Sequence, residues 1–231
     1  MPTERRALVT GSSSGIGKAI AGKLLADGWR VVGFDIAPPS LPGPAFEPVS
    51  VDLCDGAAAE AAARATGTVD AFVHAAGVLR VGALGNLRAD DGELMWRLHV
   101  QAAAHIANGV VPAMAAAGKG RVVLVGSRVA QGLAGRSQYA GTKAALIAMA
   151  KSWAAEVVAR GVTVNVVSPA ATQTAMLEDP QRRAEPPKLP PLGRLIRPDE
   201  IASLVAFLLS PEAAAITGQD ISICAGSTLP R

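Results

Sequence analysis

The chain has 231 residues, enough for one domain with a sizeable buried core or for two small ones at most. Half of the residues are hydrophobic, 18% are charged and only 3% are aromatic, which excludes a disordered chain and requires a core of Ala, Val, Leu and Ile. The net charge of +3 comes from scattered Lys and Arg, and without a basic stripe interleaved with aromatic residues the composition argues against nucleic-acid binding.

Short apolar runs of strand length alternate along the chain with longer, Ala-rich stretches of helical periodicity. We expect strands at residues 7–9, 30–34, 49–51, 71–74, 121–125, 162–167 and 221–223, and helices that include 15–27, 92–114, 139–160 and 198–209. The strands are nearly continuous apolar runs, which is typical of strands buried on both faces. The alternation therefore predicts an α/β fold, a doubly wound parallel β-sheet with helices on both faces, in a single domain spanning residues 1–231.

Two proline-rich segments interrupt this pattern. Residues 37–44 follow the second strand and are expected to form a surface loop, because proline supports neither a helix interior nor a strand ladder. Residues 177–197 contain five prolines between Pro180 and Pro191, together with several basic residues. This second segment is either a solvated loop or a lid over a site.

The segment LVTGSSSGIGKAIA joins the first expected strand to the first expected helix. Its Gly11, Gly15 and Gly17 form a close variant of the G-x-G-x-x-G pattern that binds dinucleotides. Glycines allow a tight turn and let the backbone approach a pyrophosphate, while the helix N-terminus supplies N–H donors and the positive end of its dipole. The alternative is that the turn needs glycine for its own shape and binds nothing.

Asp35 ends the second expected strand, about 20 residues beyond the glycine turn. A carboxylate there accepts hydrogen bonds from a ribose 2′-hydroxyl and repels a 2′-phosphate, and no basic residue stands beside it in the sequence. The position predicts NAD as the cofactor rather than NADP, with a solvated loop aspartate as the alternative.

The stretch QYAGTKAAL, residues 138–146, contains the only tyrosine of the chain, Tyr139, and Lys143 one helical turn later. Positions i and i+4 share a helix face, so the phenol and the ammonium point the same way. A nearby ammonium favours the phenolate and lowers the pKa of a phenol from its usual value of about 10. A tyrosine tuned in this way exchanges a proton with an alcohol near neutral pH, although the spacing alone also fits an ordinary surface pair.

Together these residues give the chain a resemblance, over essentially its whole length, to the short-chain dehydrogenase/reductase family. The matching motifs, in chain order, are TGSSSGIG (10–17), Asp35, VDL (51–53), HAAG (74–77), GRVVLVGS (120–127), YAGTK (139–143), VTVNVVSPAATQT (162–174) and ITGQDISICAG (216–226). The family fold is a Rossmann-like, doubly wound parallel sheet that carries both the cofactor and the active site. That fold agrees with the alternation of strands and helices.

The resemblance implies a role for each matching residue. Tyr139 would be the general acid/base, Lys143 would lower its pKa and bond the nicotinamide ribose, and Ser127 would hold the substrate carbonyl or hydroxyl. The cofactor-binding residues would be Gly11, Ser13, Gly15, Ile16, Gly17, Asp35, Asp52, Leu53, His74, Ala75, Ala76, Gly77, Tyr139, Lys143, Pro169, Ala170, Thr172 and Thr174. A substrate loop around 177–192 would close the pocket, together with residues 131–137.

Four positions depart from the usual family pattern. His74 replaces an asparagine that ties strands together, and Ala170 replaces a glycine. Gly126 stands where many relatives have a second serine, which leaves Ser127 as the only hydroxyl at that strand end. His99 occupies the place of the helix asparagine that holds a water and completes the usual catalytic tetrad. Since histidine also binds water through either nitrogen, His99 is a candidate catalytic residue in the proton relay, with a packing role as the alternative.

The predicted protein is thus an NAD-dependent oxidoreductase that interconverts a small or medium secondary alcohol and its ketone. Another reaction of the family, such as epimerisation or dehydration, is one alternative, and a non-catalytic NAD-binding regulator is another. The complete set of Ser127, Tyr139 and Lys143 argues against the regulator. No metal is expected, since Cys54 and Cys224 match no metal-ligand spacing.

Location and assembly follow from the apolar stretches. The N-terminus has no signal-peptide pattern and no apolar run is long enough to span a bilayer, so the protein is expected to be cytoplasmic and without a membrane partner. The helices at 92–114 and 139–160 are rich in alanine, and residues 144–150 form an apolar stripe wider than one helix face. That surface predicts a homo-oligomer, a tetramer or a dimer, with a monomer that buries both helices against its sheet as the alternative.

Overall fold

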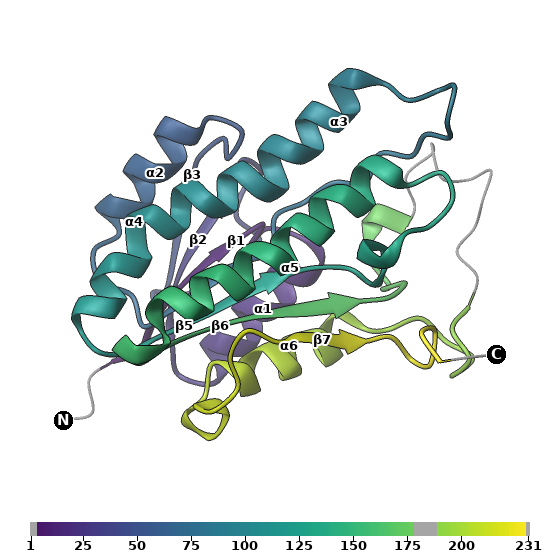
Figure 1. Cartoon of the computed structure of the whole chain (residues 1–231). Helices are drawn as coiled ribbons and strands as arrows, with labels where there is room; N and C mark the ends of the chain where they lie inside the picture. Colours follow the sequence, from purple (N-terminus) through teal and green to yellow (C-terminus); the bar gives the residue numbers. More distant parts are fainter. Residues whose placement is uncertain (1–3, 178–188, 230–231) are drawn as a thin grey trace.

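A seven-stranded parallel sheet organises the chain (Figure 1). The computed structural model describes residues 4–177 and 189–229. The strands are β1 (Arg6–Thr10), β2 (Arg30–Asp35), β3 (Phe46–Ser50), β4 (Ala71–His74), β5 (Gly120–Val125), β6 (Val162–Pro169) and β7 (Asp220–Ile223). Their order is β3-β2-β1-β4-β5-β6-β7, and neighbouring strands run parallel throughout. The predicted α/β fold with a doubly wound parallel sheet is confirmed.

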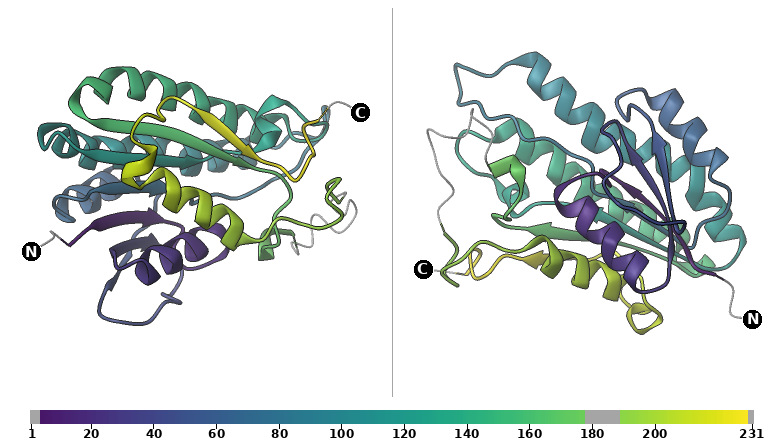
Figure 2. Two further views of the ribbon diagram at one scale, coloured as in Figure 1. Left: turned by 90° about the horizontal axis from the view of Figure 1, so that it is seen from below. Right: turned by 180° about the vertical axis from the view of Figure 1, so that it is seen from behind.

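Helices cover both faces of this sheet (Figures 1 and 2). They are α1 (Gly15–Ala26), α2 (Gly56–Ala65), α3 (Ala89–Trp96), α4 (Ala102–Ala116), α5 (Ser137–Val157) and α6 (Pro198–Leu208). On one face, Ile20 of α1 and Ile201 of α6 belong to the same apolar core. On the other face, Ile106 of α4 and Leu146 of α5 belong to a second core. The sheet therefore lies between two helix layers, and both cores are built mainly from Ala, Val, Leu and Ile, as the composition requires.

Most elements lie where the sequence predicts them, with shifted ends. β3 covers residues 46–50 rather than 49–51 and includes Pro48, which a strand at the edge of a sheet tolerates. Residues 37–44 have neither helix nor strand, as their prolines predict. α2 was not among the helices expected by range; it begins where the Asp55 side chain accepts a hydrogen bond from the third residue along, an N-cap that its sequence encodes.

The helix expected at 92–114 begins three residues earlier, at Ala89, and contains a local change of helical type. Residues Arg97–Gln101 form one π-helical turn between α3 and α4, and His99 lies buried in its middle. Such turns carry an extra residue, interrupt the regular backbone bonding and are frequent at functional sites. The sequence pattern gave no sign of this turn, because its apolar spacing fits an uninterrupted helix equally well.

The direction in which successive strands are added reverses at β1, with β2 and β3 on one side and β4 to β7 on the other. In open parallel sheets, ligands bind outside the carboxyl ends of the strands at such a reversal. Thr10 and His74, the last residues of β1 and β4, pair directly, so the glycine turn and the segment after β4 leave the sheet side by side. Among residues 4–177 and 189–229, no helix is long and apolar enough to cross a membrane.

Candidate active site

A cavity of about 880 Å³ opens beyond the carboxyl ends of the central strands. Its lining includes most of the predicted site residues: Gly11, Gly15, Ile16, Gly17, Ala75, Ala76, Gly77, Ser127, Tyr139, Lys143, Pro169, Ala170, Thr172 and Thr174. The other predicted residues, Ser13, Asp35, Asp52, Leu53, His74 and His99, lie outside that lining. The fold thus brings the glycine turn after β1 and the Ser-Tyr-Lys set around one space.

The glycine turn packs too closely for any side chain at two of its positions. A Cβ on Gly17 would lie 2.1 Å from the carbonyl oxygen of Gly11, and a Cβ on Gly11 would lie 2.9 Å from the Cα and N atoms of Ala76. Gly15 has a φ of +52°, a backbone angle that favours glycine. These glycines therefore let β1, α1 and the segment after β4 approach one another at the cavity wall.

The first turn of α1 offers its backbone N–H groups to the cavity. Ser14 is the N-cap residue, but its side chain forms no capping hydrogen bond, and the first turn contains no acidic residue. A helix start of this kind binds an anion through N–H groups and the helix dipole. The donor set and the glycine cradle fit the pyrophosphate of a dinucleotide.

Asp35 ties the end of β2 to the glycine turn. Its carboxylate accepts hydrogen bonds from the backbone N–H groups of Ser13 and Ala37, both at 2.9 Å. Since an ionised carboxylate has about four acceptor sites, these two bonds leave capacity for further donors such as ribose hydroxyls. Further along, the Asp52 side chain accepts a hydrogen bond from the N–H of Cys54 at 2.8 Å, and Leu53 is buried in the core.

The Ser-Tyr-Lys residues come from the end of β5 and the first two turns of α5. Ser127 is buried, and its Oγ accepts a hydrogen bond from the N–H of Val129 at 3.2 Å. Lys143 is only 4% exposed, its Nζ donates to the carbonyl of Val125 at 2.9 Å and lies 5.7 Å from the centre of the Tyr139 ring. Burial lowers the pKa of Lys143 to about 7, so its ammonium exchanges a proton near neutral pH.

His99 has a protein partner for each ring nitrogen. The N–H of Val78 donates to Nε2 at 3.0 Å, so the ring hydrogen is on Nδ1, which donates to Thr142 Oγ1 at 2.8 Å. The hydroxyl of Thr142 in turn donates to the carbonyl of Tyr139 at 2.8 Å. Burial holds the pKa of His99 well below its usual range, which keeps the ring neutral. Its edge meets the Tyr139 ring at 5.6 Å between centroids, with the planes at 89°.

His74 lies beneath the same wall in the opposite tautomer. The hydroxyl oxygen of Thr10 accepts from the two backbone N–H groups that follow His74, at 3.0 and 3.1 Å. The hydroxyl hydrogen of Thr10 is therefore donated to Nδ1 of His74, at 3.0 Å, and the ring hydrogen of His74 is on Nε2. The backbone carbonyls of Leu98 and His99 lie beside this ring, although within the described chain Nε2 makes no hydrogen bond of ordinary geometry with them. Burial lowers the pKa of His74 to about 3, so this ring is neutral as well.

Two other departures from the family pattern have local explanations. A Cβ on Gly126 would lie 2.6 Å from both Ser168 Oγ and Val166 Cγ1, so a serine here would require one or both of these β6 side chains to shift. Ala170 lies outside the left-handed region, because Ala225 is the one non-glycine residue with positive φ in the described chain. Alanine at position 170 therefore causes no backbone strain.

The cavity lining also contains residues that the sequence did not single out. They are Leu79, Arg128, Val129, Leu133, Ala134, Arg136, Met176 and Leu177. Five of these belong to the segment between Ser127 and Tyr139, of which the sequence placed only the range 131–137 in the pocket. Of the expected substrate loop, residues 178–188 lie outside the described residues.

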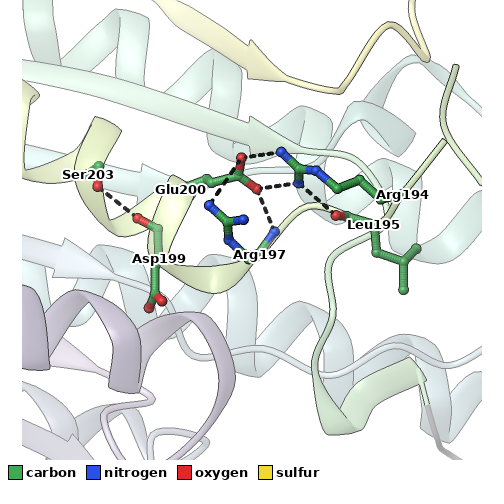
Figure 3. A network of polar contacts seen from close by, with 6 residues as sticks. All are labelled: Arg194, Leu195, Arg197, Asp199, Glu200 and Ser203. Carbon is green, nitrogen blue, oxygen red and sulfur yellow. Dashed lines mark hydrogen bonds and ion pairs between the residues drawn. The ribbon is translucent and has the colours of Figure 1, made fainter. Parts of the chain in front are cut away.

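A polar network fixes the chain where it returns from that loop (Figure 3). Arg194 binds the carboxylate of Glu200 with two hydrogen bonds of 2.8 and 2.7 Å, and Glu200 also accepts from the N–H of Arg197 at 2.8 Å. These bonds lower the pKa of Glu200 to about 2, with the Arg194 guanidinium as the main cause. Ile196, between the two arginines, forms a bridge with Thr172 in the cavity wall, so the network anchors one side of the site.

Comparisons with known proteins find relatives that match nearly the whole chain. The family profile described as enoyl-(acyl carrier protein) reductase matches residues 11–228. The 3-oxoacyl-(acyl-carrier-protein) reductase FabG of Vibrio cholerae serotype O1 is 37% identical and covers 95% of this chain and 96% of its own length. Oxidoreductase UcpA of Escherichia coli O157:H7 is 32% identical, and the match covers 99% of this chain and 96% of the length of UcpA. The ligand-free aldohexose dehydrogenase AldT of Thermoplasma acidophilum shares the fold, with a TM-score of 0.89 over 99% of this chain and 95% of its own, at 24% identity.

Proposed function

We propose, from the premise that this chain belongs to the short-chain dehydrogenase/reductase family, that it interconverts a small or medium secondary alcohol and its ketone. As a member of that family it is an NAD(P)-dependent oxidoreductase acting on CH–OH groups. The observation that carries the proposal is one cavity with the glycine turn on one wall and Ser127, Tyr139 and Lys143 on the other. NAD(P), when bound, supplies the hydride acceptor for alcohol oxidation and the hydride donor for ketone reduction.

The chain's own residues handle the proton. Ser127 Oγ holds the substrate oxygen. The Tyr139 phenolate takes the proton from an alcohol in oxidation, and the Tyr139 phenol returns it to the developing alkoxide in reduction. Lys143, buried and bonded to the carbonyl of Val125, places a cation beside Tyr139 and favours its ionised form. Its pKa of about 7 lets Lys143 pass a proton onward at neutral pH.

In our proposal His99 is a positioning residue, which helps to hold Tyr139 in place. Both of its nitrogens are bonded to protein groups, one to Val78 and one to Thr142, which leaves neither for the water of a relay. The bonding therefore favours the packing role over the relay role. His99 and Thr142 together fix the first turns of α5 against the segment that follows β4.

The cofactor in this proposal is NAD rather than NADP. The glycine turn and the first N–H groups of α1 would hold the pyrophosphate, and Thr172 and Thr174 would hold the carboxamide. The carboxylate of Asp35, bonded to two backbone N–H groups, would accept from the ribose hydroxyls and repel a 2′-phosphate. Epimerisation or dehydration by the same residues is the alternative reaction, and product analysis by chromatography separates it from alcohol oxidation.

The proposed assembly is a homo-oligomer with two-fold symmetry. On α5 a single stripe that includes Leu146 and Ala150 is buried against the sheet, whereas Gly141, Ala144 and Ala148 remain exposed on the outer face. Trp96 on the neighbouring α3 is 45% exposed. Small residues permit close helix contact. Burial of this apolar face against a second copy would lower the free energy of the assembly.

Replacing Tyr139 by phenylalanine tests the reaction. The change removes the hydroxyl that exchanges the proton and retains the ring, so turnover should fall at least ~100-fold, the usual scale for a general acid/base. The assay follows NADH absorbance with a panel of secondary alcohols, and calorimetry should find NAD affinity little changed. Near-normal turnover in the variant would remove Tyr139 from the mechanism, and a wild-type protein that binds NAD without turnover on any alcohol or ketone would favour a regulator.

A further inference from the structure

The charged side chains that line the cavity are all positive among the described residues. Its lining includes Arg128, Arg136 and Lys143, and within residues 4–177 and 189–229 no aspartate or glutamate lines it. A cleft with charges of one sign concentrates ligands of the opposite sign. Lys143 already has a place beside Tyr139, so the two arginines are the charges that the reaction leaves unexplained.

The two arginines belong to the substrate side of the cavity. Arg128 directly follows Ser127 at the end of β5, and Arg136 is the N-cap residue of α5, three positions before Tyr139. The glycine turn, by contrast, follows β1, which is separated from β5 by β4. A dinucleotide whose pyrophosphate lies at α1 therefore has its main anionic group at the far wall, away from both guanidinium groups.

Among residues 4–177 and 189–229, no carboxylate neutralises either guanidinium. In the described part of the chain, the side chains of Arg128 and Arg136 form no ion pair with a carboxylate and no hydrogen bond. Elsewhere on the molecule arginines do have such partners, for example Arg194 with Glu200. Arg128 and Arg136 are half-buried, and the cavity lining around them is apolar, with residues such as Leu133. A half-buried charge in an apolar wall is stabilised when a ligand supplies the counter-charge.

We propose that the substrate carries an anionic group, a carboxylate or a phosphate, which Arg128 and Arg136 bind while Ser127 and Tyr139 hold the reacting oxygen. This inference rests on the proposed oxidoreductase function and specifies its substrate class. The planar fork of arginine matches both anions with paired hydrogen bonds. The anion is either part of a small oxo acid or the phosphate of a thioester carrier.

Two pairs of matched substrates distinguish these sources. Acetoacetate and ethyl acetoacetate present the same ketone with and without a carboxylate. Acetoacetyl-coenzyme A and the acetoacetyl thioester of N-acetylcysteamine present the same thioester with and without phosphates. We expect the charged member of one pair to have at least ~10-fold higher kcat/KM than its neutral partner, since charge-assisted hydrogen bonds are worth about that much. Equal use of the charged and neutral members in both pairs would overturn the proposal.

Variants then assign the effect to the two arginines. Arg128→Gln and Arg136→Gln should each raise KM for the preferred charged substrate by about 10- to 100-fold and leave the neutral partner within about 2-fold. Arg128→Lys keeps the charge but loses the paired donors, so it should fall between Arg128→Gln and the wild type. Arg160→Gln, at an exposed arginine in the short turn that follows α5, is the matched control and should change neither KM. Gln variants in which KM rises equally for the charged and the neutral substrate would contradict anion binding.

Equilibrium binding separates this inference from the proposed function. Calorimetric titration of NAD-loaded Tyr139→Phe protein with acetoacetate and with coenzyme A needs no turnover. Binding of either probe that is lost in the Arg128→Gln, Tyr139→Phe double variant supports the anion site even if no ketone is reduced by the wild type. If ketones are reduced but neither probe binds, the oxidoreductase function stands and the anion site is wrong.

Discussion

Burial of Lys143 makes the free energy of unfolding depend on pH. The side chain is 4% exposed, and burial lowers its pKa from an ordinary 10.5 to about 7. Between these two values the unfolded chain binds a proton that the folded chain does not, so the free energy of unfolding rises with pH over this window. The stability is fully present above the unfolded pKa and is lost as pH falls towards the folded pKa.

The size of this effect follows from the two pKa values. One pKa unit corresponds to about 1.4 kcal/mol, so Lys143 alone should contribute a gain of about 2 kcal/mol between about pH 7 and about pH 9. Urea unfolding of the cofactor-free protein at both pH values, at constant ionic strength, measures this difference. Lys143→Met should remove it, whereas Lys151→Met, an exposed lysine on the same helix, should keep it. If Lys143→Met and the wild type gain equally with pH, the lysine is not desolvated as described.

Four further predictions concern the bonding, the glycine turn, the cofactor and the assembly. His99→Leu leaves the N–H of Val78 without its acceptor and should lower the free energy of unfolding, measured in urea, by about 1–3 kcal/mol. His99→Asn keeps an acceptor and should lower the free energy of unfolding by less. Gly17→Ala places a Cβ 2.1 Å from a carbonyl oxygen, so it should lower the free energy of unfolding by about 1–3 kcal/mol and weaken NAD binding. In the same helix the Cβ of Gly22→Ala meets no atom closer than 3.8 Å, so this control should leave the free energy of unfolding unchanged or raise it. Kinetics with both cofactors should give a higher kcat/KM for NAD than for NADP, and Asp35→Asn should narrow the gap; a wild-type preference for NADP would contradict the role of that carboxylate. Light scattering at micromolar concentration should return a multiple of 23.4 kDa, and a monomer mass would show that the exposed face of α5 has no partner copy.

Local spacing accounts for what the sequence predicts well. Strand and helix periodicity indicated a parallel α/β sheet, because each element shows its own burial pattern over a few residues. The glycine turn and the pair Tyr139 and Lys143 were also readable, since both depend on residues that are only two to four positions apart in the sequence. The same local logic missed the π-helical turn around His99, whose residues fit a regular helix.

The tertiary structure decides what depends on residues far apart in the chain. Val78 and Thr142 reach His99 from separations of 21 and 43 residues and determine which nitrogen carries its proton. Lys143 loses its solvent because β5 and α5 enclose it, and no composition or spacing encodes that enclosure. The cationic substrate wall is of the same kind, because Arg128 and Arg136 acquire their shared cavity only when strand, turn and helix pack. Sequence records which groups are present, whereas hydrogen-bond partners, desolvation and the sign of a cavity depend on distances that only packing sets.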